Sequence, residues 1–419
     1  MTVYFAFRTG PASSAGGRAW HDAAVRDYDP FAPSTLEDPA PAHRWLREQC
    51  PVHRYERFDP PFYSLARHDD VLDGLRDIDT WSSEFGQGPM MHKQGGMLDD
   101  PPGHTMFRRM TLSTFTPRAV ERIAPTVEVL ANELVDGMVA NGATTGDVHD
   151  GIAYPLPVIT IARMLGVAEA DREQFKAWSD ASVAGLGGGD QVARDAARRG
   201  LNGYFLAEMA KRRAVIDAGG EPPDDLVTGL VRAARDAPRA IDDSELLGVL
   251  GQLLIGGNET TTSLITNAVW RLCERPELWA ALVADPSLVE VALEESLRFD
   301  PPVLGLFRTN RCPVTRRDVA IPAGSKVMML YASANRDADV WDEPDTFRLD
   351  RDVADLRRRH LSFGSGVHFC LGAPLARLEA SASLHALVRR LPRLRLDGPM
   401  ERIEPFLLYG KRRLPVRWD

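Results

Sequence analysis

A long helical pattern in the middle of the chain constrains its fold more than any other feature. It begins at an acidic cap near Asp243 and continues to about Cys273. At 1.5 Å per residue, a helix of roughly 30 residues spans about 45 Å, which is enough to cross a whole domain. Its middle, "GGNETTTS" at 256–263, is nevertheless polar and starts with two glycines, although each glycine costs a helix interior about 1 kcal/mol relative to alanine. Because such a turn weakens a buried helix, its presence predicts that the turn itself has a function.

The rest of the chain favours one mostly helical domain with a small β part. Residues 1–40 are rich in Pro, Gly, Ala and Ser, and we expect them to form a loose N-terminal arm before a single domain at 41–419. Helical periodicity dominates as far as about residue 300, and β-branched runs such as "DVAIPAGSKVMML" at 318–330 then predict strands.

Net charge, the lack of long apolar runs and the cysteine spacing argue against several classes of protein. The net charge is -9, from 50 basic and 59 acidic residues, which argues against binding to nucleic acid through phosphate neutralisation. The chain has no run of about 18 apolar residues, so we expect no membrane span. The four cysteines lie far apart without CxxC spacing, which predicts neither disulfides nor a zinc site and suits a reducing cytoplasm.

One cysteine stands in a setting that indicates metal chemistry. Cys370 lies in "FGSGVHFCLG" at 363–372, framed by glycines and followed by a helical pattern. Glycine permits close backbone approach, and a helix N-terminus stabilises a thiolate. A hydrogen-bonded thiolate is the sulfur ligand that a haem iron needs. An isolated cysteine is more often a small buried hydrophobic residue, but the glycine frame favours the ligand.

The pattern F-G-x-G-x-H-x-C-x-G resembles the haem-binding loop of the cytochrome P-450 superfamily. The chain resembles the soluble bacterial branch of that family over about residues 40–419. The resemblance implies a triangular, mainly helical domain that holds haem b between the long central helix and the cysteine loop. It makes Cys370 the axial ligand of the haem iron, with Phe363 packed beside the thiolate and Gly372 completing the cofactor-binding loop.

Further motifs imply contacts to the haem propionates. The residues that match the family positions are His104, Arg108, Arg308 and His368. Four donors suit two carboxylates, because buried anions need hydrogen-bonded partners. Arg308 has a neighbouring alternative in Arg311.

The ExxR pair of the family is matched by Glu295 and Arg298, which are three residues apart on one predicted helix face. The resemblance implies that this pair is buried, structural and joined by one further basic residue. Arg351 is the first choice for that residue and Arg348 the second.

The polar turn of the long helix aligns with the family motif of a small residue followed by Gly-x-acid-Thr. The resemblance implies that Gly256 leaves space for dioxygen beside the cofactor. It also implies that the Thr260 hydroxyl binds the reacting oxygen or a proton-delivering water, and that Glu259 links this site to solvent. The alternatives are a threonine bonded to its own i−4 carbonyl and a glutamate in a surface salt bridge.

A monooxygenase converts RH, O2, two electrons and two protons into ROH and water, and the resemblance implies this reaction. The segments at the family's pocket positions are apolar, and only Lys93 offers itself as an anchor for a carboxylate. We therefore expect hydroxylation or oxidative dealkylation of a neutral terpenoid, steroid-like or aromatic compound, while a fatty acid remains open. The pocket candidates are Met90, Met91, Met97, Leu98, Leu186, Leu253, Val303, Leu304, Leu306, Leu407 and Leu408.

Electrons are expected from a separate ferredoxin or flavodoxin with its reductase, since the chain ends at Asp419 without a fused reductase domain. Arg109 and Arg377 are candidates for a basic docking face, and a solvated helix face fits each equally well. Two rival functions are a peroxide-using or coupling haem-thiolate enzyme and a haem-binding sensor. The acid–threonine pair disfavours both, because neither needs delivery of protons to dioxygen.

Overall fold

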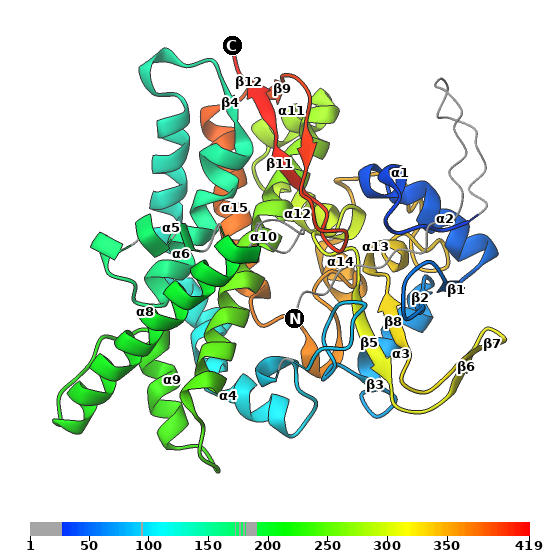
Figure 1. Ribbon diagram of the computed structural model, residues 1–419. Coiled ribbons are helices and arrows are strands. Elements are labelled where there is room, and N and C mark those ends of the chain that lie inside the picture. The colour runs from blue at the N-terminus through cyan, green and yellow to red at the C-terminus, as the bar shows by residue number, and fades with distance from the viewer. Residues whose placement is uncertain (1–26, 94, 172, 176, 179–180, 182–190) are drawn as a thin grey trace.

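Helices gather on one side of the molecule and a five-stranded sheet lies on the other (Figure 1). The computed structural model describes residues 27–419 except 94, 172, 176, 179–180 and 182–190. The longer helices are α4 (Gly103–Phe115), α5 (Pro117–Met138), α6 (Pro155–Met164), α8 (Gln191–Asp217), α9 (Leu226–Arg235), α10 (Asp243–Glu274), α11 (Pro276–Ala284), α12 (Leu288–Phe299) and α15 (Ala373–Arg390). The shorter ones are α1 (Pro33–Glu37), α2 (Ala40–Gln49), α3 (His68–Arg76), α13 (Tyr331–Ala334) and α14 (Val353–Arg359). The predicted mainly helical architecture with a small β part is confirmed.

The main sheet has the strand order β1–β2–β8–β5–β3. Its strands are β1 (Val52–Tyr55), β2 (Phe62–Leu65), β8 (Lys326–Met329), β5 (Leu306–Asn310) and β3 (Trp81–Ser82). β2 and β8 run parallel, and the other neighbours are antiparallel. The smaller sheets pair β6 (Val314–Arg316) with β7 (Val319–Ile321), β10 (Glu401–Arg402) with β11 (Lys411–Arg413), and β12 (Pro415–Arg417) with β4 (Thr145–Asp147) and β9 (Arg395–Leu396). The run at 318–330 thus forms β7 and β8, as predicted.

Helix α10 crosses the helical side and belongs to two hydrophobic cores. Asp242 caps it through a reciprocal capping box with Glu245, as suits an acidic N-cap. Its N-terminal half gives one core Leu246, Val249, Leu250 and Leu254, and its C-terminal half gives the other Leu264, Ile265, Ala268 and Val269. The polar turn at 256–263 therefore lies between two apolar clusters, so packing at both ends holds a helix whose middle is weak.

The described part of the predicted N-terminal arm is packed rather than loose. Tyr28 is only 1% exposed, and the Phe31 ring lies 4.6 Å from that of Phe406. Both residues belong to a cluster with strands β1, β2 and β5. Residues 28 and 31 of the expected arm thus contribute aromatic side chains to the cluster beside the sheet.

Candidate functional site

The cysteine loop at 363–372 is shaped by two glycines in left-handed backbone conformations. Gly364 has φ +70° and Gly366 has φ +71°, a region that side-chain-bearing residues rarely adopt. A Cβ at Gly366 would also lie 3.0 Å from the carbonyl oxygen of Leu75 in α3. The Cys370 N–H donates to the Phe363 carbonyl at 2.9 Å, which closes the loop and carries the thiol to the start of α15.

Opposing electrostatic influences act on the Cys370 thiol. Its residue is exposed, yet desolvation by the surrounding atoms raises the pKa of the thiol. Backbone N–H groups of Gly372 and Ala373 and the charge of Arg108 act in the opposite direction. These are the groups that would stabilise a thiolate once a cation binds to the sulfur.

A histidine of this loop meets a histidine from a distant segment. The rings of His104, in α4, and His368 lie 4.3 Å apart. Within the described residues, neither His104 Nδ1 nor His368 Nε2 has a hydrogen-bond partner, although both atoms are buried. Burial, Arg308 and His104 hold the pKa of His368 at about 3. Two buried ring nitrogens side by side need a polar partner, which an acidic ligand group would supply.

Two arginines complete this set of donors. Arg108 Nη1 donates to the Phe369 carbonyl at 2.7 Å. Arg308 is only 4% exposed, and its guanidinium donates to the carbonyl of Phe307 at 3.1 Å. Arg311 instead is ion-paired with Asp100 through a side chain that is 46% exposed. The geometry thus favours Arg308 over Arg311 as the buried cation that needs an anionic partner.

The polar turn of α10 has open space beside its glycines. A Cβ on Gly256 or Gly257 would meet no atom within 4 Å. Thr260 Oγ1 donates to the Gly256 carbonyl at 2.7 Å, which is the i−4 bond of the structural alternative. The oxygen keeps its lone pairs and can accept a proton donor. Glu259 is 8% exposed, so the alternative of a surface salt bridge is wrong.

Haem suits this donor set. A single thiol, two unpartnered imidazole nitrogens and a buried guanidinium match an iron that accepts sulfur and two propionates that accept N–H groups. Among the described residues, no three His, Cys, Asp or Glu side chains gather in a group that could hold a bare metal ion. The thiol therefore suits an iron whose other ligands come from a cofactor.

The ExxR residues are fully buried and ion-paired. Arg298 contacts Glu295 at 2.6 Å, and both side chains are 0% exposed. Arg351 Nε lies 3.2 Å from the same carboxylate. The side chain of Arg348 pairs instead with surface carboxylates, including Asp350 at 2.9 Å. The geometry therefore favours Arg351 as the third member.

The two predicted docking cations differ in their surroundings. Arg109 is exposed on α4. Arg377 is 22% exposed in its side chain and lies 2.6 Å from Glu294, a carboxylate that is 1% exposed. Sequence reasoning treated Arg377 as a solvated or docking residue and missed Glu294, whose only signal is its position directly before the ExxR glutamate.

Backbone and side-chain hydrogen bonds connect several of the segments that carry the pocket candidates. Val303 and Leu408 form a backbone bridge, and Gln252 of α10 accepts the Met97 N–H at 3.0 Å. Buried or partly buried members are Met97, Leu98, Leu253, Val303, Leu304, Leu306, Leu407 and Leu408. Met90 and Met91 are 39% and 47% exposed, and Leu186 lies outside the described residues.

A second residue missed by sequence reasoning anchors one of these segments. Lys326 is 2% exposed in β8, and its ammonium donates to the carbonyls of Phe85 and Gly86 at 3.0 and 2.7 Å. Burial and the charge of Arg308 lower the pKa of Lys326 to about 8. A lysine inside a strand that is otherwise apolar was the signal available in the sequence.

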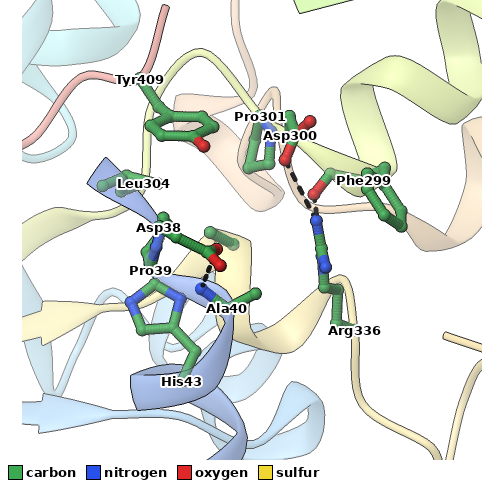
Figure 2. Close-up of a pocket in the computed structure, with 11 residues that line it drawn as sticks. Asp38, Pro39, Ala40, His43, Phe299, Asp300, Pro301, Leu304, Arg336 and Tyr409 are labelled. Carbon is green, nitrogen blue, oxygen red and sulfur yellow. Dashed lines mark hydrogen bonds and ion pairs between the residues drawn. The ribbon is translucent and has the colours of Figure 1, made fainter. Parts of the chain in front are cut away.

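A separate small cavity lies under the N-terminal segment (Figure 2). Asp300, Arg336 and His43 line it together with Leu304, and Arg336 donates to Asp300 at 3.1 Å. None of the residues predicted to hold the cofactor lines this cavity. Its two buried charged lining groups, Asp300 and Arg336, are paired with each other, so we assign it no ligand.

Comparisons with known proteins agree with this geometry. The cytochrome P450 family model matches residues 190–402. The chain is 37% identical to the cytochrome P450 monooxygenase PikC of Streptomyces venezuelae, over 76% of this chain and 74% of that protein. It is 38% identical to the erythromycin C-12 hydroxylase of Saccharopolyspora erythraea, over 84% and 87%. The crystal structure of CYP109E1 from Bacillus megaterium in complex with corticosterone matches with a TM-score of 0.81 and 30% identity, over 92% of this chain and 99% of that one.

Proposed function

This chain belongs to the cytochrome P450 family and is a haem monooxygenase, and on that premise we propose that Cys370 ligates the iron of a haem b. His104, Arg108, Arg308 and His368 bind its propionates, and Phe363, Gly256 and Gly372 surround it. One observation carries this assignment. The ring of His104 lies beside that of His368 in the loop that bears the thiol, and each ring has a buried nitrogen without a hydrogen-bond partner among the described residues.

When bound, haem supplies the redox chemistry that inserts one oxygen atom of O2 into the substrate. The chain's own residues hold the proton route. Thr260 donates to the Gly256 carbonyl and accepts a hydrogen bond from a water or an acidic oxygen through its remaining lone pairs. Glu259, directly before it and buried, exchanges protons with that water.

The substrate is a neutral hydrophobic small molecule, of terpenoid, steroid-like or aromatic type. Lys93, the only candidate anchor for a carboxylate in the pocket segments, is ion-paired with Glu84, which supports a substrate without a carboxylate. The methionine-containing segment at 86–98 suits irregular apolar shapes. The corticosterone bound to the Bacillus megaterium relative also supports this choice.

Electrons come from a ferredoxin or flavodoxin with its reductase. The exposed Arg109 on α4, next in sequence to the cofactor residue Arg108, suits an acidic partner. A cytoplasmic location fits this supply and the four free cysteines.

The reduced carbon-monoxide difference spectrum of the holoenzyme tests this proposal. A thiolate-type band is expected in the wild-type protein and its loss in Cys370→Ser. A wild-type spectrum without that band would sink the assignment. Titration with steroid, terpenoid, aromatic and fatty-acid panels, followed by the Soret shift to high spin, then tests the substrate class. Product formation from peroxide alone at the rate seen with reduced partners would favour the peroxide-using alternative.

A further inference from the structure

Glu294 is the hub of a buried charge cluster behind the cysteine loop. It lies in α12, and its side chain is 1% exposed. Its carboxylate accepts hydrogen bonds from Arg377 at 2.6 Å, Arg357 at 2.9 Å and His360 at 3.0 Å. Burial acts to raise the pKa of Glu294, but the hydrogen bonds of His360 and Arg377 outweigh it and hold this pKa at about 2. The group is therefore a carboxylate at neutral pH.

The hub contacts both flanks of the cysteine loop. His360 lies a short way before the loop, between α14 and Phe363, and Arg377 lies in α15 after it. His360 Nδ1 accepts the Ser362 N–H at 3.4 Å, so Nε2 carries the proton that it donates to Glu294. One carboxylate thus joins the entry and the exit of the segment that carries Cys370.

Arg377 connects this hub to the loop itself. Its guanidinium lies 4.6 Å from the ring centroid of Phe363, within range of a cation–π contact. The Phe363 carbonyl accepts the Cys370 N–H, and the charge of Arg377 acts on the thiol directly by lowering its pKa. The cation that stabilises the thiolate is thus itself balanced by Glu294.

We propose that Glu294 is a positioning residue for the haem-thiolate ligand: it orients Arg377 against Phe363 and compensates its charge, and so sets the reduction potential of the iron. This inference rests on the proposed ligation by Cys370. Reduction adds an electron to the iron site, so a nearby uncompensated cation favours the reduced form and an uncompensated anion opposes it.

Reduction potentials of the holoenzyme variants test the proposal through their sign. Glu294→Gln leaves Arg377 without its counter-charge, and the potential rises. Arg377→Gln leaves the carboxylate without its closest cation, and the potential falls. The double variant returns towards the wild-type value. Glu290→Gln is the matched control, because Glu290 lies one turn earlier on α12 and pairs with Arg357 on the exposed side, so its potential stays unchanged.

A role in folding alone predicts something different. Loosening the loop would shift both single variants in the same direction and convert the carbon-monoxide band to the thiol type in proportion. Shifts of equal sign, or no shift beyond that of Glu290→Gln, would overturn the proposal. If Glu294→Gln yields no holoenzyme, Arg377→Lys decides. If the charge at this position sets the reduction potential, Arg377→Lys keeps the wild-type value. If the charge does not set it, Arg377→Lys shifts the potential as Arg377→Gln does.

The test of Glu294 can fail without contradicting the proposed function of the protein. A wild-type protein with a thiolate-type band but no opposite shifts overturns the role of Glu294 alone. A wild-type protein without that band overturns both.

Discussion

The cysteine loop and the polar turn of α10 are proposed to face one cofactor, yet they are held in different ways. The loop at 363–372 is flanked by His360 and Arg377, which both bind the buried Glu294 carboxylate of α12, and its Gly366 fits against α3. We call this the clamped side. The polar turn at 256–263 has open space beside Gly256 and Gly257, and Met91 in the segment at 84–98 is 47% exposed. We call this the open side.

The difference follows from what each side must do. A metal ligand has one productive geometry, so the residues behind it are buried and paired. A site for varied apolar substrates benefits from side chains that adjust their shape. We therefore expect changes on the clamped side to cost stability and changes on the open side to alter coupling and selectivity.

The largest expected effect is on the clamped side, in Glu295→Ala. This change leaves the guanidinium of Arg298 buried without its counter-charge, which costs about 3–5 kcal/mol of unfolding free energy. Urea unfolding of the holoenzyme measures it. Arg348→Ala is the control, because its exposed ion pairs are worth about 0–1 kcal/mol. Equal losses of unfolding free energy in the two variants would show that the buried ion pair of the clamped side stabilises the fold no more than an exposed pair does.

Acid provides the next test of the clamped side. The pKa of Glu294 in the folded protein, about 2, lies below the ordinary glutamate value of 4.5. Its contribution, on the order of 3 kcal/mol, is therefore fully present above pH 4.5 and is lost as pH falls towards 2. His360 acts in the same direction, because burial lowers its pKa. We expect the unfolding free energies of the wild type and Glu294→Gln to converge over this range. A gap that is constant with pH would contradict the assignment.

Between the two sides, Arg308→Ala is expected to weaken retention of haem by about 10–100-fold. The buried guanidinium is the cation that we assign to a propionate. The rate of haem transfer to an excess of apomyoglobin measures the loss. Arg311→Ala, which removes an exposed partner of Asp100, should leave that rate near the wild-type value. A larger effect of Arg311→Ala would reverse our choice between the two arginines.

On the open side, Thr260→Ala removes one hydrogen bond, worth about 0.5–1.5 kcal/mol of stability. Its main effect is expected on the coupling of electron consumption to product formation, since a positioned proton-transfer group contributes about 10²–10⁴-fold to the rate of a reaction. We expect consumption of reducing equivalents with release of peroxide and several-fold less product. Thr262→Ala is the contrast. Its fully buried hydroxyl binds the Ala153 carbonyl, so stability falls while coupling stays. Unchanged coupling in Thr260→Ala would remove the proton-delivery role.

The smallest change in stability is expected for Met91→Ala. Its side chain is 47% exposed, so the unfolding free energy should change by less than about 0.5 kcal/mol. The substrate affinity measured by the Soret shift should nevertheless change, because the methionine is proposed to cover the pocket. Val129→Ala on α5, which is also exposed, should change neither. Identical binding in both variants would exclude Met91 from the pocket.

Local patterns explain why much of the fold was predictable. The acidic cap of α10 and the strand run at 318–330 depend on neighbours in sequence, and the structure has the cap at Asp242, next to the expected Asp243, and strands β7 and β8 within that run. The sequence pattern did not predict that, within the expected arm at 1–40, Tyr28 is buried and Phe31 is partly buried against partners from distant segments. Composition alone describes residues near the N-terminus as loose and does not register such contacts.

For the site, the sequence by itself determined the residue types: a cysteine in a glycine-rich loop, histidines and arginines in recognisable motifs, and a polar turn inside an apolar helix. Only the tertiary structure decided between Arg308 and Arg311 and between Arg351 and Arg348, and it alone brought Arg377 to Glu294. The physical reason is that burial and pairing of charge depend on segments far apart in the chain. Glu294 and Arg377 are 83 positions apart, and no local rule states that they meet.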